Sequence, residues 1–260
     1  MRKISLKNVL QRRKVIIFTS IVLCTCVVFM LNQTRLAISA MSNANKKLPI
    51  YCVGTDEKKM AISFDAAWGA DDTDELLRIL NENDVKTTFF MCGYWVEKYP
   101  KEVMKIALEG HDLGNHSSTH PHMNQLTKSQ IKKELQDAHK KVYQLTGYEM
   151  DLFRPPFGEY NNTVLEVAEE EGYYVVQWDV DSLDWMEYGV QAEIDRVLNH
   201  KNLRDGSIVL FHNDAKYTPA ALDIIIKGLK EKGYEIVPIS ELIHRQGYYM
   251  DHEGRQILSN

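Results

Sequence analysis

Apolar and polar positions along residues 59–248 predict strands that alternate with helices. Short apolar runs, such as 60–64 (MAISF) and 207–212 (SIVLFH), have the length and composition of buried strands, and 173–180 (YYVVQWDV) is predicted as one further strand. Longer segments place apolar residues at helical spacing, as in 74–83 (DELLRILNEN). About seven such repeats predict a parallel sheet with right-handed crossovers. An α/β barrel and an open doubly wound sheet both fit this pattern.

Helix ends carry their own signals. Thr127 with Gln130 predicts a capping box for the helix that Gly147 ends, and Asp71-Asp72-Thr73 is predicted to cap the helix that follows the first strand. No glycine-rich phosphate loop follows any predicted strand, which disfavours a nucleotide cofactor.

The N-terminus departs from this alternating pattern. Residues 1–14 carry six basic and no acidic side chains, and residues 15–31 are uncharged. The apolar run is near the lower limit for a membrane-spanning helix, roughly 17–25 residues, so we expect a transmembrane signal anchor. The basic cluster predicts a cytoplasmic N-terminus and an extracytoplasmic C-terminal domain at the cell membrane. A cleaved signal peptide that releases a secreted protein is the alternative, with small residues at 37–40.

The remaining boundaries follow from composition. We expect a linker and lead-in strand over 32–58, one α/β domain over 59–248 and a polar tail over 249–260. The chain of 260 residues has a net charge of −5, and without its basic N-terminus the charge is about −11. An acidic body excludes nucleic acid as the expected partner, because nucleic acid requires a basic face.

Four cysteines are present. Cys24 and Cys26 lie in the apolar run. Cys52 and Cys92 could form a disulfide if the compartment is oxidising, although only geometry decides this.

Ionisable residues gather where the predicted strands end. In either α/β architecture the carboxyl ends of the strands form one rim, and chemistry occurs there. The residues that follow strand ends are Asp65, Asn115, His116, His120, Arg154, Asp179, Asp181, Asp184, Trp185, His212, Asn213 and Asp214.

Each of these residues could have either a purely structural role or a role in catalysis or metal binding. His116 and His120, four residues apart, would share one face of a helix and could bind a metal such as zinc. Asp65 could be a turn residue or a general base, and Arg154 a salt-bridge partner that keeps it ionised. His212 could be a core residue, or a general acid held protonated by Asp184.

The segment 155–158 (PPFG) could be a stiff turn or could present a backbone N–H to an oxyanion. Only Phe157 and Gly158 have such an N–H, since proline has none. Aromatic residues near these strand ends could belong to the core or line a groove of sugar size: Trp178, Trp185, Phe211 and Tyr160.

Five blocks in this order, SFDAAWG, HSSTH, RPPFG, DSLDW and LFH, resemble the polysaccharide deacetylases of the NodB-homology or carbohydrate esterase 4 family. The likeness covers roughly residues 59–242. It implies a distorted (β/α)7-type barrel and a metal-dependent removal of acetyl groups from chitin-like or peptidoglycan sugars.

The resemblance also implies roles for individual residues. Asp65 is the general base, Arg154 orients it, and Asp184 tunes the general acid His212. His116 and His120 bind the divalent metal. The expected substrate contacts are the Phe157 N–H at the oxyanion, Trp185 and Leu210 at the acetyl group, and Tyr160 and Trp68 along the groove.

One position departs from the family pattern. The first block usually reads TFDDG, where the second aspartate is a metal ligand, and here that position is Ala66. Two neutral histidines alone make a weaker site, which Asp71, Asp72 or water could complete. The sporulation-associated PdaB-like subgroup has a similarly changed first block, which implies a cell-wall or spore-cortex role.

Three functions are therefore open. The first is a membrane-anchored deacetylase of cell-wall amino sugars that uses a divalent metal. The second is a wall-glycan-binding protein that retains the groove but is catalytically impaired by Ala66. The third is a metal-free amide hydrolase in which His116 and His120 bind substrate.

Overall fold

The computed structural model describes residues 29–30, 33 and 46–259. The chain divides into two compact units, Met1–Lys46 and Lys47–Asn260, and the fold below is that of the second unit. The predicted basic tail and membrane anchor lie almost entirely outside the described residues. Within the described part, no helix has both the length and the hydropathy needed to cross a membrane.

The central sheet of this unit is parallel throughout. Its strands are β2 (Lys59–Ala66), β3 (Thr88–Met91), β4 (Asp112–Asn115), β5 (Leu152–Phe153), β6 (Tyr174–Val175), β7 (Val180–Asp181), β8 (Ile208–His212) and β9 (Glu235–Ile236). They lie in the order β6-β5-β4-β3-β2-β8-β7, and β9 pairs with the start of β2.

The sheet curls into a half-barrel because one short segment supplies both of its edges. β6 and β7 are the outermost strands, yet they are neighbours in the chain. The single strand predicted over 173–180 is therefore wrong. Val176 leaves the sheet to bridge to Ile50 in the lead-in segment, and the chain then crosses to the opposite edge. The predicted parallel α/β sheet with barrel-like curvature is confirmed.

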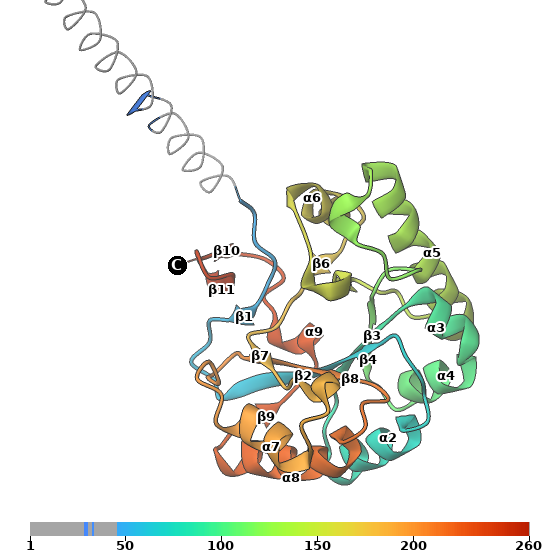
Figure 1. The fold of residues 1–260 in the computed structure, drawn as a ribbon, viewed down its shortest axis with the longest axis vertical. Coiled ribbons are helices and arrows are strands. Elements are labelled where there is room, and N and C mark those ends of the chain that lie inside the picture. The colour runs from blue at the N-terminus through green and yellow to red at the C-terminus, as the bar shows by residue number, and fades with distance from the viewer. Residues whose placement is uncertain (1–28, 31–32, 34–45, 260) are drawn as a thin grey trace, which may run out of the picture. The chain divides into compact units, whose positions relative to one another are not determined.

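Helices cover the outer face of this sheet, as Figure 1 shows. They are α2 (Thr73–Glu82), α3 (Gly93–Lys98), α4 (Pro100–Leu108), α5 (Lys128–Thr146), α6 (Asn162–Glu170), α7 (Val190–Leu198) and α8 (Thr218–Glu231). The capping box of Thr127 and Gln130 at the start of α5 is confirmed, as is the left-handed Gly147 at its end. Asp72, within the segment predicted to cap α2, is its N-cap residue, but its side chain makes no capping hydrogen bond and accepts the Asp214 N–H at 2.8 Å.

Side chains of β2 alternate between two buried environments. Phe64 and Ala66 belong to the large apolar cluster between the sheet and the outer helices. Ala61 belongs to a second cluster inside the curl, closed by α9 (Ile239–Leu242). Since strand side chains alternate with a period of two, Ser63 and Asp65 also face the inside of the curl. The site carboxylate is thus built into the inner face of a fully buried strand.

The segment 249–260, expected as a polar tail, contributes a second sheet. β10 (Tyr248–Met250) and β11 (Arg255–Leu258) form a hairpin, and β11 pairs with β1 (Cys52–Val53) in the order β1-β11-β10. Asp251 closes the turn by accepting the backbone N–H groups of Glu253 and Arg255. Charged residues of this segment, Asp251 and Glu253, belong to the turn of the hairpin, and so their composition resembles that of a tail.

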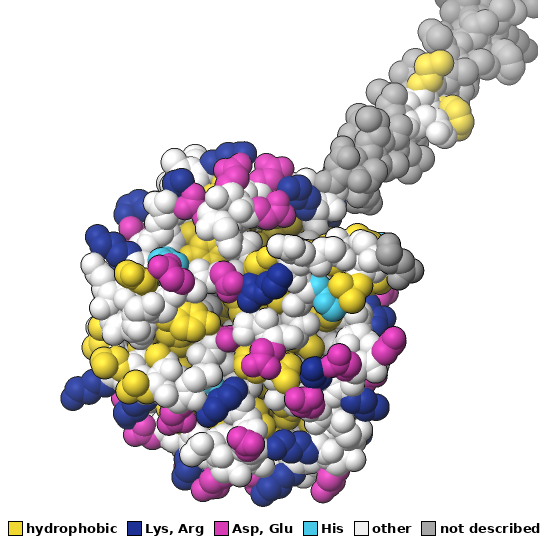
Figure 2. All heavy atoms as spheres, turned by 180° about the vertical axis from the view of Figure 1, so that it is seen from behind, with side chains coloured by type: hydrophobic (Ala, Val, Ile, Leu, Met, Phe, Trp, Pro, Cys, Tyr) yellow, Lys and Arg dark blue, Asp and Glu magenta, His cyan; other side chains and the backbone are white. Residues whose placement is uncertain are grey.

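Acidic and basic side chains are intermingled on the face seen in Figure 2. Some charged side chains of the described residues pair along one helix, such as Lys227 with Asp223 on α8 and Lys133 with Asp137 on α5. Such exposed pairs contribute little to stability, about 0–1 kcal/mol each.

The junction of β1, β2 and β8 depends on Gly206. Its N–H donates to the Lys59 carbonyl and its own carbonyl accepts the Val53 N–H, at φ +80. A Cβ at this position would overlap the Val53 carbonyl, whereas Gly110, at φ +79, has open space around it.

We therefore expect Gly206→Ala to lower the free energy of unfolding by about 1–3 kcal/mol more than Gly110→Ala does. Both substitutions introduce the strain of a left-handed alanine, about 1–2 kcal/mol, so their difference isolates the overlap. Urea unfolding of the two variants measures it. Equal losses of unfolding free energy in the two variants would show that the backbone around Gly206 shifts to accommodate the Cβ without a measurable cost in stability.

Candidate active site

A buried ion pair lies at the centre of the rim. The Arg154 Nη1 donates to Asp65 Oδ1 at 2.8 Å, and the Arg154 side chain is fully buried. Burial on its own would raise the pKa of Asp65, but the charge and hydrogen bond of Arg154, together with the charges of His116 and His212, outweigh burial and lower that pKa. Asp65 is therefore a carboxylate at neutral pH, the state that a general base requires.

The second amino group of Arg154 fixes its orientation. Nη2 donates to Ser63 Oγ at 2.9 Å and to the Gln177 carbonyl at 3.1 Å. The guanidinium also lies 4.1 Å from the Phe90 ring centroid. Phe90 fits there because its neighbour on β4 is Gly114, where a Cβ would overlap the Phe90 ring.

His212 lies beside Asp65 on the adjacent strand β8, in direct register with it. Its Nδ1 is 2.8 Å from Asp184 Oδ1, and its backbone N–H donates to Asp184 Oδ2 at 2.6 Å. Burial lowers the pKa of His212, but the hydrogen bond and charge of Asp184, together with the charges of Asp65 and Asp181, outweigh burial and raise it. The sequence-based pairing of Asp65, Arg154, Asp184 and His212 is thus realised as one continuous group.

The loop after β4 brings the two predicted metal ligands together in an unexpected way. Residues 116–120 are not helical, because Ser117 and His120 adopt left-handed φ values of 66° and 56°. These turns bring the His116 and His120 ring centroids to 5.0 Å from one another. The spacing would place both histidines on one face only if the segment were a helix, and it is not. Their side chains nevertheless lie close together, as that prediction required.

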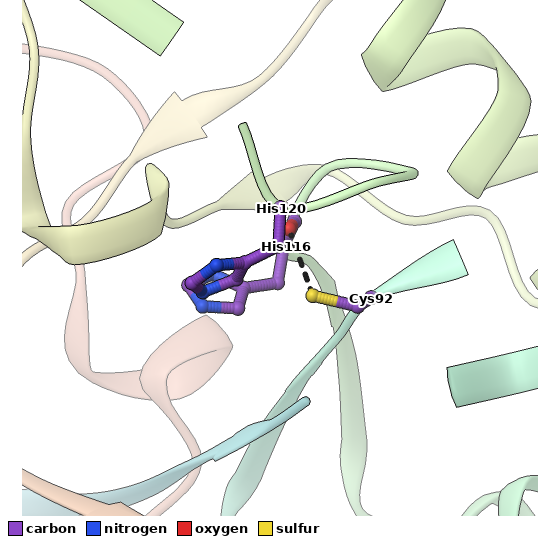
Figure 3. Close-up of side chains that lie close together, drawn as sticks. All are labelled: Cys92, His116 and His120. Atoms are coloured by element: carbon purple, nitrogen blue, oxygen red, sulfur yellow. Dashed lines mark hydrogen bonds between the residues drawn. The ribbon is translucent and has the colours of Figure 1, made fainter. Parts of the chain in front are cut away.

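The two imidazoles are suited to bind a cation. Burial lowers the pKa of His116 and lowers that of His120 to about 4, so both rings are neutral at physiological pH. The Nδ1 of His116 lies 2.7 Å from the Arg154 carbonyl, which orients Nδ1–H toward it and leaves Nε2 as the free lone pair. Cys92 is the third residue whose ligand atom lies within 4.8 Å of theirs (Figure 3).

The predicted oxyanion donor is consistent with its local geometry. The Gly158 N–H donates to the Pro155 carbonyl at 3.2 Å, so it is already engaged. No hydrogen bond of the Phe157 N–H is found within residues 46–259, and Phe157 itself is left-handed at φ 60. Of the two N–H groups in this turn, Phe157 is the one that a substrate oxygen could accept from.

Aromatic side chains flank this group. Trp68 is 47% exposed and stacks on His212 with 4.9 Å between ring centroids, and Trp185 is half exposed next to Asp184. Leu210 is buried on β8. Tyr160 packs against the apolar core and its hydroxyl lies 3.2 Å from that of Tyr51, so its ring belongs to the body of the domain.

Other rim candidates have structural partners. Asp179 accepts the Ile208 N–H and the Ser207 hydroxyl, so it holds the beginning of β8 and not its end. Cys52 and Cys92 are both free and buried, which settles the disulfide question against pairing.

Three residues that support the site were not identified from the sequence. The Thr218 hydroxyl donates to Asp184 at 3.2 Å, Ser63 binds Arg154, and the Glu134 carboxylate on α5 accepts the N–H groups of Ser118 and Thr119. Only Ser63 has a visible signal, since it is the single hydroxyl within an otherwise apolar strand. Thr218 and Glu134 lie on helices, where polar residues are ordinary.

Comparisons with known proteins agree with this geometry. The family profile described as polysaccharide deacetylase matches residues 53–176. Peptidoglycan-N-acetylglucosamine deacetylase from Bacillus cereus is 36% identical over 196 residues, which cover 74% of this chain and 91% of that protein. Peptidoglycan-N-acetylmuramic acid deacetylase PdaA from Bacillus subtilis is 33% identical, with 74% of each protein covered. The chain spans only 60% of the uncharacterized protein YlxY from Bacillus subtilis, at 33% identity over 75% of this chain.

Solved structures add a further observation. BA3943 from Bacillus anthracis, described as a CE4 family pseudoenzyme, matches with a TM-score of 0.72 and 30% identity over 82% of this chain and 73% of that one. A BA3943 mutant described as having restored enzymatic activity matches with the same TM-score and 32% identity, over 80% of this chain and 72% of that one.

The contact between His212 and Asp184 predicts a pH dependence. A raised pKa in the folded state means that protonated His212 stabilises the fold below the ordinary value of 6.5, and that this contribution is lost as pH rises through the raised pKa. We expect Asp184→Asn to lower the His212 pKa, because only the charges of Asp65 and Asp181 then oppose the effect of burial. NMR titration of the imidazole measures this change.

Asp195→Asn, an exposed carboxylate on α7, is the matched control and should leave the His212 titration unchanged. If Asp184→Asn also left it unchanged, Asp184 would not control the protonation of His212.

Proposed function

We propose, since this chain belongs to the polysaccharide deacetylase family, that it removes N-acetyl groups from amino sugars of the cell wall. The family makes it a hydrolase that acts on amide bonds. The observation that carries the proposal is the register of Asp65 and His212 on adjacent strands, where Arg154 keeps the first charged and Asp184 raises the pKa of the second.

Asp65 acts first in this scheme. Its carboxylate accepts a proton from the water that attacks the acetyl carbonyl carbon, and Arg154 keeps the carboxylate ionised between turnovers. The attack turns the carbonyl oxygen into an oxyanion, and the Phe157 N–H donates a hydrogen bond to it.

His212 completes the reaction. Its imidazolium donates a proton to the departing amine nitrogen, so the C–N bond breaks to give acetate and a free amine. Asp184 holds the ring orientation throughout, and Trp68 covers one face of the imidazole.

A divalent ion fits the neutral donors of His116 and His120, which would hold it. When bound, such an ion polarises the acetyl carbonyl as a Lewis acid. Because Ala66 supplies no carboxylate, the ion depends on other ligands of this chain.

The proposal also covers the substrate of the protein and its location in the cell. The names of the relatives support peptidoglycan N-acetylglucosamine or N-acetylmuramic acid as the substrate, and the Ala66 change supports a PdaB-like role in the spore cortex. We further propose that residues 15–31 anchor the chain in the cell membrane and that residues 59–248 act outside it, as the basic residues 1–14 indicate.

A glycan-binding protein with impaired chemistry is the second candidate. It is favoured by Ala66 and by the similarity to BA3943, described as a pseudoenzyme. The intact group of Asp65, Arg154, Asp184 and His212 argues for activity, since binding alone needs no acid–base pair.

We expect the full-length chain in detergent to release acetate from peptidoglycan fragments or chitooligosaccharides when Zn²⁺ is added. Asp65→Asn and His212→Ala should each reduce that rate by roughly 100- to 10,000-fold, the usual contribution of a positioned acid or base. Acetate is measured by a coupled enzymatic assay.

The exposed His252 provides a matched control, and His252→Ala should leave the rate unchanged. Glycan binding with no acetate release in any variant would favour the binding protein. Release that survives a strong chelator would favour the metal-free hydrolase.

A further inference from the structure

The strand end that lost its carboxylate is packed against a thiol. Ala66 is fully buried, and its carbonyl accepts the N–H of Cys92, the residue that follows β3, at 3.0 Å. Both residues belong to the same apolar cluster outside the sheet. The backbone of Cys92 therefore lies next to Ala66, the position at which the resembling family has its metal-binding aspartate.

Cys92 is also joined to the histidine loop. Its Sγ donates to the His116 carbonyl at 3.3 Å, and the next two residues, Gly93 and Tyr94, donate their N–H groups to the Ser117 and Ser118 carbonyls. Figure 3 shows both imidazoles projecting to the same side of this loop, with Cys92 approaching from the end of β3. Within residues 46–259, the ligand atoms of Cys92, His116 and His120 form a set that lies within 4.8 Å.

We propose that Cys92, as a thiolate, is the third protein ligand of a divalent ion held by His116 and His120, in place of the carboxylate that Ala66 lacks. The inference rests on the metal-dependent function proposed above. On binding, the thiol proton passes to solvent, and the Sγ turns from the His116 carbonyl to the ion.

Charge and ligand chemistry favour this assignment. A thiolate carries the same single negative charge as the missing carboxylate, so the net charge of the occupied site is restored. Two imidazoles and one thiolate also form a zinc-type donor set with one position open for water or substrate. The partly exposed His120 connects the buried thiol to solvent.

The carboxylates near this strand end are engaged elsewhere. The Oδ1 of Asp65 is paired with Arg154, while its Oδ2 lies 3.5 Å from the His116 Nε2, and the Oδ2 of Asp72 accepts the Asp214 N–H. The Asp214 Oδ1 in turn accepts the Asp71 N–H at 3.3 Å, so this acidic loop is tied to β8 and not to the histidines. Neither Asp71 nor Asp72 belongs to the Cys92 set.

The opposing reading is that Cys92 is only an apolar core residue, since it is fully buried. Cobalt substitution separates the two readings, because a thiolate bound to Co²⁺ gives a charge-transfer absorption in the near ultraviolet and imidazole does not. The probe is the full-length chain titrated with Co²⁺ and then competed with Zn²⁺.

We expect the wild type to show this band and Cys92→Ser and Cys92→Val to lose it, with affinity for Zn²⁺ reduced by roughly 10-fold or more. Cys92→Val retains an apolar side chain of similar size, so a preserved fold by circular dichroism shows that the loss is not one of packing. Cys52→Ser, the other buried free cysteine, is the matched control and should keep the band. Cys24 and Cys26 are present in every variant, so they cannot produce the difference.

A second measurement uses Ala66→Asp. If Cys92 already fills the vacant ligand position, Ala66→Asp should raise the Zn²⁺ affinity much more in the Cys92→Ser background than in the wild type. A rise of equal size in both backgrounds overturns the inference, because independent sites add.

The remaining outcomes separate this inference from the proposed function. Co²⁺ that binds through His120 without a thiolate band overturns ligation by Cys92 and leaves the metal-dependent deacetylase standing. No metal binding at all overturns the inference, and acetate release in chelator then decides whether the deacetylase proposal survives without metal.

Discussion

The buried ion pair of Arg154 and Asp65 is the constraint on which the site depends. Removing one partner of such a pair leaves an uncompensated charge, at a cost of about 3–5 kcal/mol. The pair joins β2 to the turn after β5, and Arg154 also reaches the Gln177 carbonyl in the segment between β6 and β7. That segment closes the curl of the sheet. The Arg154 side chain therefore both keeps Asp65 ionised and fixes the edge of the sheet through the Gln177 carbonyl.

Much of this arrangement was predictable from the sequence, and the failures have physical reasons. The rim set Asp65, Arg154, Asp184 and His212 follows from the rule that parallel strands end at one edge, and all four meet there. The loop at 116–120 was not predictable as non-helical, because left-handed turns at Ser117 and His120 are imposed by distant contacts, including the Glu134 carboxylate. The division of 173–180 follows from the pairing of Val176 with Ile50, which local pattern does not show. The proximity of Cys92 to the two histidines was also not predictable, because Cys92 lies far from them in the sequence and forms no recognisable metal-binding motif with them.

The site has two halves that come from different strands. The proposed base and acid lie on β2 and β8, and the proposed metal donors follow β3 and β4. His116 connects the halves, since its Nε2 is 3.5 Å from Asp65 Oδ2 and its Nδ1 faces the Arg154 carbonyl. A change at the end of β2 can thus alter the metal half while the acid–base half keeps its geometry. This separation explains how the chain combines an intact proton-transfer group with an altered ligand set.

The environment of Ala66 gives a physical reason for the ligand position proposed at Cys92. Ala66 is fully buried in an apolar cluster, where a carboxylate without a bound ion would carry a large desolvation penalty. An alanine removes that penalty whether or not an ion is bound. A cysteine at the adjacent strand end is compatible with both the ion-free and the ion-bound site. Without an ion, its neutral thiol packs in the core like a small apolar side chain. When an ion binds, the thiol would lose its proton and become a ligand. With the ligands proposed here, the domain would not need an ion in order to fold, and ion binding would be separated from the stability of the sheet.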